Sequence, residues 1–485
     1  MFFALKKNIQ KMTTGVFFSS TMTWAFLASP FPCQASSIGP GVLTLERAVD
    51  YALAHQPSIE AKQAIEDKAL AGLEKARVDY LPNVYITGEE VQATANNTPG
   101  FFLPLIFSGF SAGLPIIEGS RPVGQFGTSA WNSESSFFIS KDVLGLLRQM
   151  GFVDAALLKL QREKVGLDAQ RLIVAFNAAD AFMTELEALQ TIRAAKAGVS
   201  RMYALVIAVN GLVTSDLRPG ADHSRAEAEL ALEQNNEYRA EQQERSARAR
   251  LSETLGIDIQ SISDRRLLQM PPESPIPQFP SAKDPFLKKA LLDISLTHSL
   301  EHATKLEYLP RVNMVSGLFL NGSGFASGGS LPSPGLGTEP TNINWAAGVI
   351  LTIPIKNLFQ TRAEVHIQEA NIKLAKARYS QLALKIKDQI ENAGAILESS
   401  RRIAGNTPKE ISAAQATERQ NLARYKAGLA TVLEVTEANR LLTRAEVDDA
   451  MARINVWRAM LLVARATGNL APFFQAVREQ TVEDP

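Results

Sequence analysis

The sequence predicts a mostly α-helical protein with a small β part, built from two similar halves. Three observations lead to this fold class. Stretches without proline are long enough for helices of about seventy residues, as between Val143 and Arg218. Two pairs of strand-like segments, each strand about twelve residues long, are separated by loops rich in Gly, Ser and Pro. The same order of segments occurs twice along the chain, which indicates an internal duplication.

The composition is that of a folded protein without a strong charge preference. Among 485 residues, 50 are Lys or Arg and 50 are Asp or Glu, so the formal net charge is zero. A nucleic-acid-binding protein would show a basic surface and a high isoelectric point. With 46% hydrophobic and 21% charged residues, the chain is close to a globular average. Nucleic acid is therefore not an expected partner.

The first 35 residues have the pattern of a secretory signal peptide. Lys6, Lys7 and Lys11 form a basic region, Gly15–Ser29 is apolar, and the triplet Cys33–Ala35 has the small-x-small form of a cleavage site. The sequence thus predicts export, with cleavage after residue 35. Because the only cysteine lies in this segment, the mature chain is expected to contain no disulfide.

The two halves are related by a constant offset. Asp222 and Glu434, Ala226 and Ala438, and the glycines Gly256 and Gly468 are each 212 positions apart. A proline-rich stretch separates the halves. The predicted organisation is a signal peptide at 1–35, a first repeat at 36–256, a linker at 257–283, a second repeat at 284–470 and a C-terminal tail at 471–485.

Each half follows the same plan. A helical segment ends at a Tyr-Leu-Pro triplet (Tyr80–Pro82 and Tyr308–Pro310), because the residue before a proline is disfavoured in the α conformation. A strand, a long loop, a second strand and a long helical region follow. The predicted strands are 83–94 and 131–143 in the first half, and 311–322 and 343–355 in the second.

The long helices carry heptad patterns that are typical of coiled coils. A helix over Leu144–Val213 would have 70 residues and a length of about 105 Å at ~1.5 Å per residue. Gly405 and Pro408 interrupt the corresponding region of the second half, so a kink or break is predicted there. Apolar heptad positions, typical of a helix–helix seam, are Leu158, Val165, Leu172, Ala179 and Leu186 in the first half, and Ala370, Ala377 and Leu384 in the second.

The predicted strands have the length of membrane-spanning β-strands. About ten tilted residues cross a bilayer, whereas the long helices are too polar to do so. No run of 18 uncharged apolar residues follows the signal peptide, which argues against a bundle of transmembrane helices. Four strands cannot close a barrel, and open edges are not tolerated in lipid. Two copies would give a filled barrel of eight strands and three copies a barrel of twelve with a small pore, so a trimer is predicted.

No enzyme, cofactor or metal site is predicted. Gly109–Gly113 matches the G-x-S-x-G pattern of serine hydrolases, but that motif requires a strand before it and a helix after it, and here it lies in an apolar loop. His298 and His302 are four residues apart, without the further ligands that a zinc site requires. The histidines are therefore expected to be solvent-exposed.

An ordered set of motifs resembles the TolC-like outer-membrane efflux protein family over residues 43–470. The motifs are Leu43–Ala48, the two Tyr-Leu-Pro triplets, Ser224–Leu230 and Tyr425–Leu429. The resemblance implies a homotrimer that forms a 12-stranded β-barrel in the outer membrane, continued by an α-helical coiled-coil barrel in the periplasm of a Gram-negative bacterium. It also implies contact with outer-membrane lipid, a periplasmic adaptor (membrane fusion) protein and an inner-membrane transporter.

The function implied is that of a channel. The resemblance favours the exit duct of a tripartite efflux system for small molecules. A duct for type I protein secretion is the alternative within transport. A periplasmic coiled-coil scaffold without a pore is the alternative from another class, although such a scaffold would not need the strand pairs.

The resemblance also implies a periplasmic gate. It places a gate tyrosine at Tyr425 and acidic pore-lining residues at Glu434 and Glu437, and the repeat offset adds Asp222 in the first half. Asp216 is a second candidate for the first-half acid, and the position of the family's gate arginine falls on Ala430. From the residues alone, Glu434 and Glu437 could instead form a solvated helix face, and Tyr425 could pack within its hairpin. Hairpin tips that would dock the adaptor are predicted at Gly211, Leu212, Gly428 and Leu429.

Overall fold

A computed structural model describes most of the chain within one compact unit, Pro40–Pro485. The residues described are 42–94, 129–215, 219–273, 280, 284–323, 337–340 and 342–480. The predicted signal peptide, part of the predicted linker and Asp216 lie outside these ranges. The domain boundaries given above therefore stay a prediction.

Four strands form one antiparallel sheet. They are β1 (Asn83–Thr94), β2 (Ser129–Asp142), β3 (Arg311–Ser323) and β4 (Asn342–Thr352), in the order β1-β2-β3-β4. Each strand lies within a few residues of its predicted position. β1 and β4 are the two edges of this sheet, and each has one side without a partner strand among the described residues.

Long helices continue from the sheet. The first half contributes α2 (Leu45–His55), α3 (Pro57–Val78), α4 (Gly145–Thr214) and α5 (Gly220–Leu255). The second half contributes α6 (Pro285–Lys305), α7 (Ile355–Lys426), α8 (Val432–Ala466) and a short C-terminal α9 (Ala471–Glu479). The predicted fold class, mostly helical with a small sheet in two duplicated halves, is confirmed.

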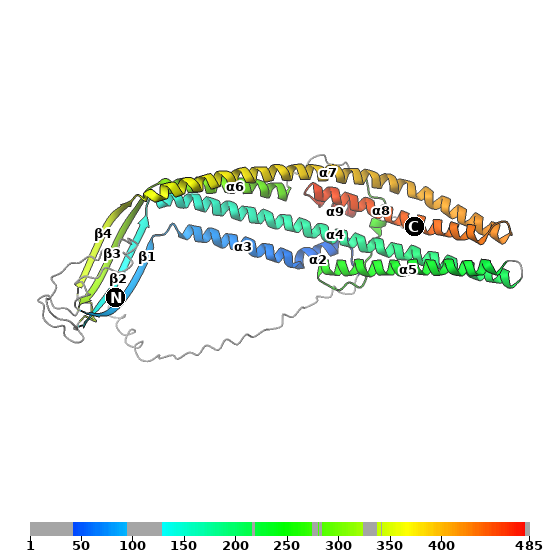
Figure 1. Ribbon diagram of the computed structural model, residues 1–485, viewed down its shortest axis with the longest axis horizontal. Coiled ribbons are helices and arrows are strands. Elements are labelled where there is room, and N and C mark those ends of the chain that lie inside the picture. The colour runs from blue at the N-terminus through cyan, green and yellow to red at the C-terminus, as the bar shows by residue number, and fades with distance from the viewer. Residues whose placement is uncertain are drawn as a thin grey trace. The chain divides into compact units, whose positions relative to one another are not determined.

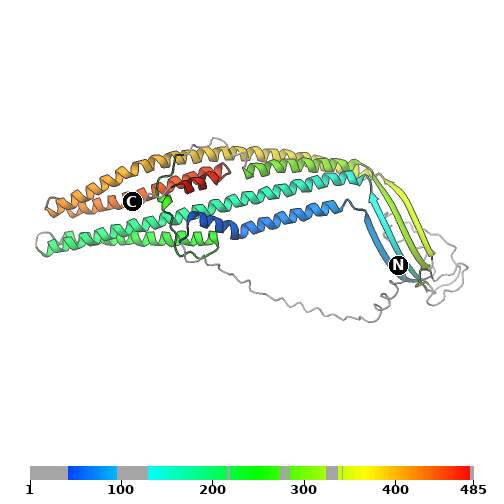
Figure 2. The same cartoon turned by 180° about the vertical axis from the view of Figure 1, so that it is seen from behind.

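The helices follow the order of the strands. α3 packs on α4, α4 on α6 and α6 on α7, so that α3 and α7 lie at the edges of this row (Figures 1 and 2). Farther from the sheet, α4 pairs with α5 and α7 with α8. The strand edges and the helix edges therefore coincide, with β1 and α3 on one side and β4 and α7 on the other.

The duplication is visible in the helix boundaries. α5 begins at Gly220 and α8 at Val432, with the offset of 212 found in the sequence. Gly256 and Gly468 terminate the two helices at φ values of 74° and 75°. This left-handed conformation is favourable for glycine and common just after a helix, which explains the two matching glycines.

Of the kink or break predicted near Pro408, the break is wrong, because α7 is one helix of 72 residues with Pro408 inside it. A proline lacks the N–H that would bond the carbonyl four residues earlier, here Ala404. The buried hydroxyl of Thr407 lies 3.3 Å from that carbonyl and 2.8 Å from Oδ1 of Asp449 on α8. Arg453 pairs with the same carboxylate at 2.6 Å. The hydroxyl has one hydrogen to donate, and its shorter contact is with Asp449, so Thr407 ties α7 to α8 beside the proline and gives the Ala404 carbonyl only the longer contact.

Replacement of Thr407 by Val is expected to destabilise the protein. The substitution keeps the side-chain shape but leaves the buried Asp449 oxygen and the Ala404 carbonyl without this donor, at a cost of about 1–3 kcal/mol. The change should lower the thermal midpoint of the helical circular dichroism signal. In a second variant, Pro408→Ala added to Thr407→Val should recover part of the loss. An unchanged midpoint in Thr407→Val would show that the hydroxyl is dispensable.

The two predicted heptad seams have different surroundings. In α4, Val165, Ala179 and Leu186 are buried within the chain. In α7, Ala370, Ala377 and Leu384 are exposed. Ile367 and Leu374 lie on the same face and are 52% and 47% exposed. We call these five α7 residues the α7 apolar face. It has the pattern of a packing surface but no partner within the described part of the chain.

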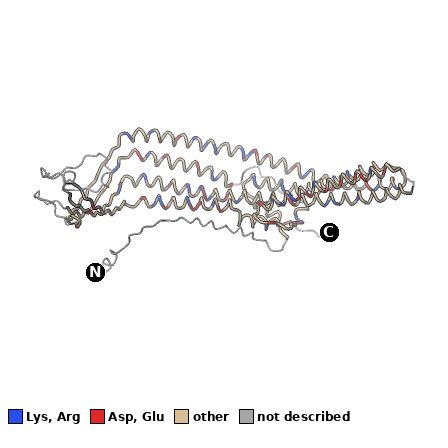
Figure 3. The backbone as a smooth tube through the Cα atoms, turned by 60° about the horizontal axis from the view of Figure 1, so that its bottom comes forward, with Lys and Arg blue, Asp and Glu red and all other residues tan. Residues whose placement is uncertain are grey.

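Among the described residues, one helix has a stretch that could cross a membrane by length and composition alone. It lies in α4, with a mean hydropathy of 1.4, and 22% of the stretch is buried in the chain. α4 also carries charged residues and packs along α5 and α8. Figure 3 shows that acidic and basic residues occur along the helices in general. A single apolar stretch in such a helix does not define a helical membrane bundle.

Candidate functional site

One face of the sheet is exposed and largely apolar, although Glu90 and Ser135 also lie on it. Residues of the four strands form a row across it, because Ile86 pairs with Phe137, Phe137 with Leu318 and Leu318 with Trp345. Ile86 is 82% and Trp345 78% exposed. We call this surface the apolar sheet face; its other exposed members are Val84, Met314, Ile343, Val349 and Leu351.

The apolar sheet face has the height of a membrane-spanning band. From Ile343 to Leu351 the strand advances about 27 Å at ~3.4 Å per residue, which is a height of about 21 Å for a strand tilted by about 40°. Outer-membrane barrels carry an outward apolar band about 25 Å tall. Trp131, at the far end of β2, lies on the same face as Phe137 by the alternation of the strand. The surface therefore suits contact with lipid.

The opposite face of the sheet is largely polar. Thr87 and Ser136 pair across β1 and β2, and their hydroxyls are hydrogen-bonded. Gly317 also lies on this face by the alternation of the strand. A side chain there would meet the ring of Phe319, which explains the glycine. Other polar residues with the same orientation are Asn83, Ser140, Asn313, Asn344 and Thr352. The two faces of the sheet thus differ in polarity.

A polar network ties the sheet to the helices. Lys141 donates to the carbonyls of Asp79 and Leu81 at 2.7 and 3.1 Å. Arg148 forms an ion pair with Asp142, whose carboxylate also accepts from the backbone of Val312 at 3.2 Å. The end of β2 is thus bonded to the segment between α3 and β1, to the start of β3 and to the first turn of α4.

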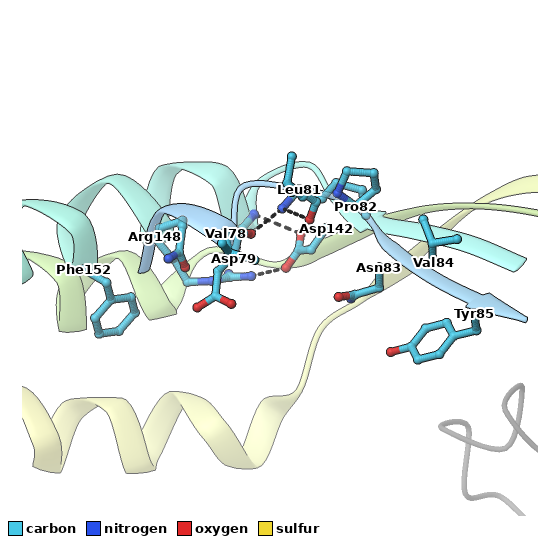
Figure 4. A pocket seen from close by; sticks show the side chains of 13 residues that line it. Val78, Asp79, Leu81, Pro82, Asn83, Val84, Tyr85, Asp142, Arg148 and Phe152 are labelled. Carbon is cyan, nitrogen blue, oxygen red and sulfur yellow. Dashed lines mark hydrogen bonds and ion pairs between the residues drawn. The ribbon is translucent and has the colours of Figure 1, made fainter. Parts of the chain in front are cut away.

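A cavity of about 650 Å³ adjoins this network. Figure 4 shows Asp79, Asn83, Tyr85 and Phe152 directed to the same side of it. Its lining combines aromatic rings with two acidic and two basic side chains, so it has no net charge to select one type of ligand.

The turn between α7 and α8 lies at the end of the helices farthest from the sheet (Figure 1). Gly428 has a φ of 79°, and its N–H donates to the carbonyl of Tyr425 at 3.0 Å. The N–H of Leu429 donates to the carbonyl of Arg424 at 2.8 Å. These bonds terminate α7 and leave the side chain of Leu429 exposed.

The predicted tip at Gly211 and Leu212 needs correction. Both residues belong to the last turn of α4, which ends at Thr214. The Gly211 carbonyl accepts hydrogen bonds from the hydroxyls of Thr214 and Ser215. The connection to α5 follows Thr214 and includes residues 216–218, which lie outside the described part of the chain.

Tyr425 is a packing residue in this chain. It is 1% exposed and belongs to a cluster that joins the ends of the two helix pairs. Its burial supports the packing alternative over pore lining. The cluster also contains Met202, Leu205 and Val209 of α4, Ala226 of α5, and Ala430, Val432 and Val435 at the start of α8.

Glu434 caps α8. Thr431 and Glu434 form a reciprocal capping box, with the Glu434 carboxylate accepting from the N–H of Thr431 at 3.2 Å. Bonds from the Thr431 backbone and hydroxyl lower the pKa of Glu434, and Arg424, 3.8 Å away, acts in the same direction. The carboxylate is thus kept ionised, but it serves the helix terminus and has a cationic neighbour.

Glu437 lies one turn farther along α8 and is exposed. Arg440 pairs with it at 2.6 Å, and this bond, followed by the more distant Glu229 and Glu233 of α5, raises the pKa of Arg440. Asp222 lies half-buried in the first turn of α5. The fold brings these predicted acids to the same end of the helices.

Two basic residues at this end were not predicted from the sequence. Arg424 and Arg440 each accompany one of the candidate gate acids. The three-residue spacing of Glu437 and Arg440 on a helix was a usable signal. Arg424 approaches Glu434 only through the turn. Among the described residues no group of three or more potential metal-ligating side chains occurs.

Comparisons with known proteins support this picture. Residues 281–469 match the family model described as outer membrane efflux protein. No curated protein sequence matches the chain.

Several solved structures are similar in fold. The outer-membrane channel OprN has 16% identity and a TM-score of 0.69, with 88% of this chain and 90% of that chain covered. The outer membrane protein VceC from Vibrio cholerae has 14% identity and a TM-score of 0.70, with 88% and 96% covered. The Campylobacter jejuni CmeC outer membrane channel has 15% identity and a TM-score of 0.70, with 90% of each covered.

The class is defined by architecture: a four-stranded sheet with two different faces, continued by long helices, which is the fold of the outer-membrane channels named above. The resemblance to the TolC-like outer-membrane efflux protein family is confirmed, since the second half carries the family's sequence pattern and the described chain has its fold.

Proposed function

We propose that three copies of this chain form an exit duct in the outer membrane of a Gram-negative bacterium. The two-faced sheet carries the proposal. Its apolar face suits lipid and its polar face suits a water-filled lumen. The helices would continue the duct into the periplasm, and transport would be passive, driven by an inner-membrane transporter. In this role the protein is a channel and not an enzyme.

The open edges support closure by further copies. β1 runs antiparallel to β2, and with four antiparallel strands β4 has the opposite direction to β1. The β4 edge of one copy can therefore pair with the β1 edge of the next and extend the same antiparallel sheet. The matching helix edges would then bring the α7 apolar face onto the neighbouring copy. Such head-to-tail contacts form a closed ring when the rotation fits.

The ends of the helix pairs are the proposed docking site for the adaptor. Leu429 is 71% exposed in the α7–α8 turn. Near the end of α4, Tyr203 and Ile207 are 59% and 57% exposed and lie four residues apart on one helix face. Exposed apolar side chains grouped in this way are typical of protein interaction surfaces.

Single-channel recording tests the proposal directly. The purified full chain, reconstituted in planar bilayers, should give discrete conductance steps. A protein that inserts into bilayers and carries no current would contradict the duct, and one that does not associate with bilayers at all would favour a periplasmic scaffold.

The gate acids and their arginines predict opposite changes in ion selectivity. If Glu437 lines the opening, Glu437→Gln removes an anionic group and should lower the cation/anion permeability ratio. Arg440→Gln removes its cationic partner and should raise the ratio, because the carboxylate then acts unneutralised. Reversal potentials in a salt gradient measure both. Equal ratios in the wild type and both variants would place this pair on an outer surface.

A further inference from the structure

Two buried carboxylates face each other between α4 and α5, away from the sheet and from the hairpin ends. Glu185 of α4 is 2% exposed and Glu244 of α5 is 6% exposed. Arg248 of α5 forms an ion pair with Glu244, and its Nε lies 3.5 Å from Oε1 of Glu185. The second oxygen of Glu185, Oε2, is buried without a hydrogen-bond partner. Two acids therefore share one guanidinium.

The other acids on this part of α4 have their own cations. Arg458 of α8 lies 3.2 Å from Asp180 and 2.9 Å from Glu187. Arg250 of α5 lies 3.9 Å from Asp180. Glu241 of α5, which is partly buried, has the exposed Arg245 as its partner at 3.9 Å. The excess of negative charge thus belongs to Glu185 and Glu244, which we call the acid pair.

The acid pair can lose its excess charge by binding one proton. An unpaired charge in a buried position is unfavourable, and two nearby carboxylates resist joint ionisation. Burial, followed by the charge of Glu244, raises the pKa of Glu185 to about 7, against the opposing effect of Arg248. A protonated Glu185 could donate a hydrogen bond to Glu244, which an ionised one cannot.

We propose that the acid pair is a proton-operated latch between α4 and α5. With the proton bound, the two carboxyl groups are joined by a hydrogen bond and the helices pack closely. Without it, two carboxylates repel each other across the interface and the end of the helix pair beyond them loosens. Nothing in this step needs the duct, so the latch is independent of the proposed function. In the proposed duct, the latch would act on the pair of α4 and α5, whose end far from the sheet carries Asp222.

The direction of the pH effect follows from the raised pKa. The folded chain keeps the proton on Glu185 up to a pH of about 7, whereas the unfolded chain loses it near the ordinary value of 4.5. Between these values the folded state binds more protons than the unfolded state, so stability falls as pH rises. The packing of α4 on α5 is expected to be strongest below this window and weakest above about pH 7.

Hydrogen–deuterium exchange on the full chain in detergent tests the latch. Peptides from α5 should exchange about tenfold faster at pH 8 than at pH 6 after correction for intrinsic exchange, since one pKa unit corresponds to a factor of ten. In Glu185→Gln the amide can still donate to Glu244, so α5 should stay protected at both pH values. Glu253→Gln, which changes an exposed acid of the same helix, should behave as the wild type.

Two outcomes would overturn the proposal. One is equal protection of wild-type α5 at pH 6 and pH 8. The other is a pH dependence that persists in Glu185→Gln. Should that variant fold poorly, Glu244→Gln removes the same repulsion from the other side and gives the same reading. Because exchange reports helix packing, failure of the latch leaves single-channel currents unaffected, and absence of currents leaves the exchange result standing.

Discussion

Introducing glutamates at Ile367 and Leu374 is expected to prevent trimer formation while leaving the helices of each chain folded. Both residues lie on the α7 apolar face and are about half exposed in one chain. If the neighbouring copy covers them, each new carboxylate is buried without a partner, at a cost of about 3–5 kcal/mol. Two such changes per copy are repeated at every interface of the ring. Light scattering in detergent should give three times the protomer mass for the wild type and the protomer mass for the double variant.

A matched variant separates this effect from a general effect of charge. Lys376→Glu and Lys387→Glu introduce two glutamates on a different exposed face of the same helix. Exposed substitutions of this kind usually change stability by less than about 0.5 kcal/mol, so this variant should remain trimeric. If Ile367→Glu/Leu374→Glu also stays trimeric, the α7 apolar face is not the interface. A wild-type chain that is monomeric with its full β content would exclude the trimer.

Lysine at position 347 is expected to block membrane assembly, whereas lysine at position 346 is not. Ala346 and Ala347 are adjacent in β4, so their side chains point to opposite faces of the sheet. Ala347 shares the apolar sheet face with Trp345 and Val349. A lysine at the lipid-facing midplane of a barrel costs about 2–4 kcal/mol, and three copies repeat that cost. Ala346 shares the polar face with Asn344, where a lysine would meet water.

The amount of protein recovered in the outer-membrane fraction measures the difference. Ala347→Lys should be strongly depleted there, and Ala346→Lys should be close to the wild type. The two variants differ only in the face that receives the lysine, so expression and total charge are matched. Equal recovery of both would contradict a lipid-facing role for the apolar sheet face, and depletion of Ala346→Lys alone would reverse the assignment of the two faces.

The paired arginines change what a gate at the hairpin ends can do. An acidic ring made of isolated carboxylates would attract cations strongly. Here Glu434 has Arg424 nearby and Glu437 has Arg440. These exposed pairs are weak individually, but they reduce the net charge. The gate is therefore expected to have a modest ion selectivity. Because Glu437 and Arg440 carry opposite charges, removing one or the other is expected to shift the cation/anion permeability ratio in opposite directions.

Local sequence signals determined the elements of this protein. Prolines after Tyr-Leu ended two helices, alternating residues marked the four strands, and the absence of proline marked the 70 residues of α4. Matching positions 212 apart revealed the two halves, down to the glycines that terminate α5 and α8. The helix ends and the strands follow from signals within a few residues, which act through backbone sterics or periodic side chains. The duplication follows from comparing the two halves of the chain. Neither requires knowledge of tertiary contacts.

The tertiary structure decided those features that depend on contact with a segment distant in the sequence. Pro408 lies inside an unbroken α7, and Thr407 beside it is bonded to Asp449 of α8. Tyr425 is buried because the two helix pairs meet around it. Glu185 and Glu244, 59 positions apart in the sequence, share one arginine only because α4 and α5 pack antiparallel. Burial and charge are properties of the contacts that folding creates, so no local pattern in the chain specifies them.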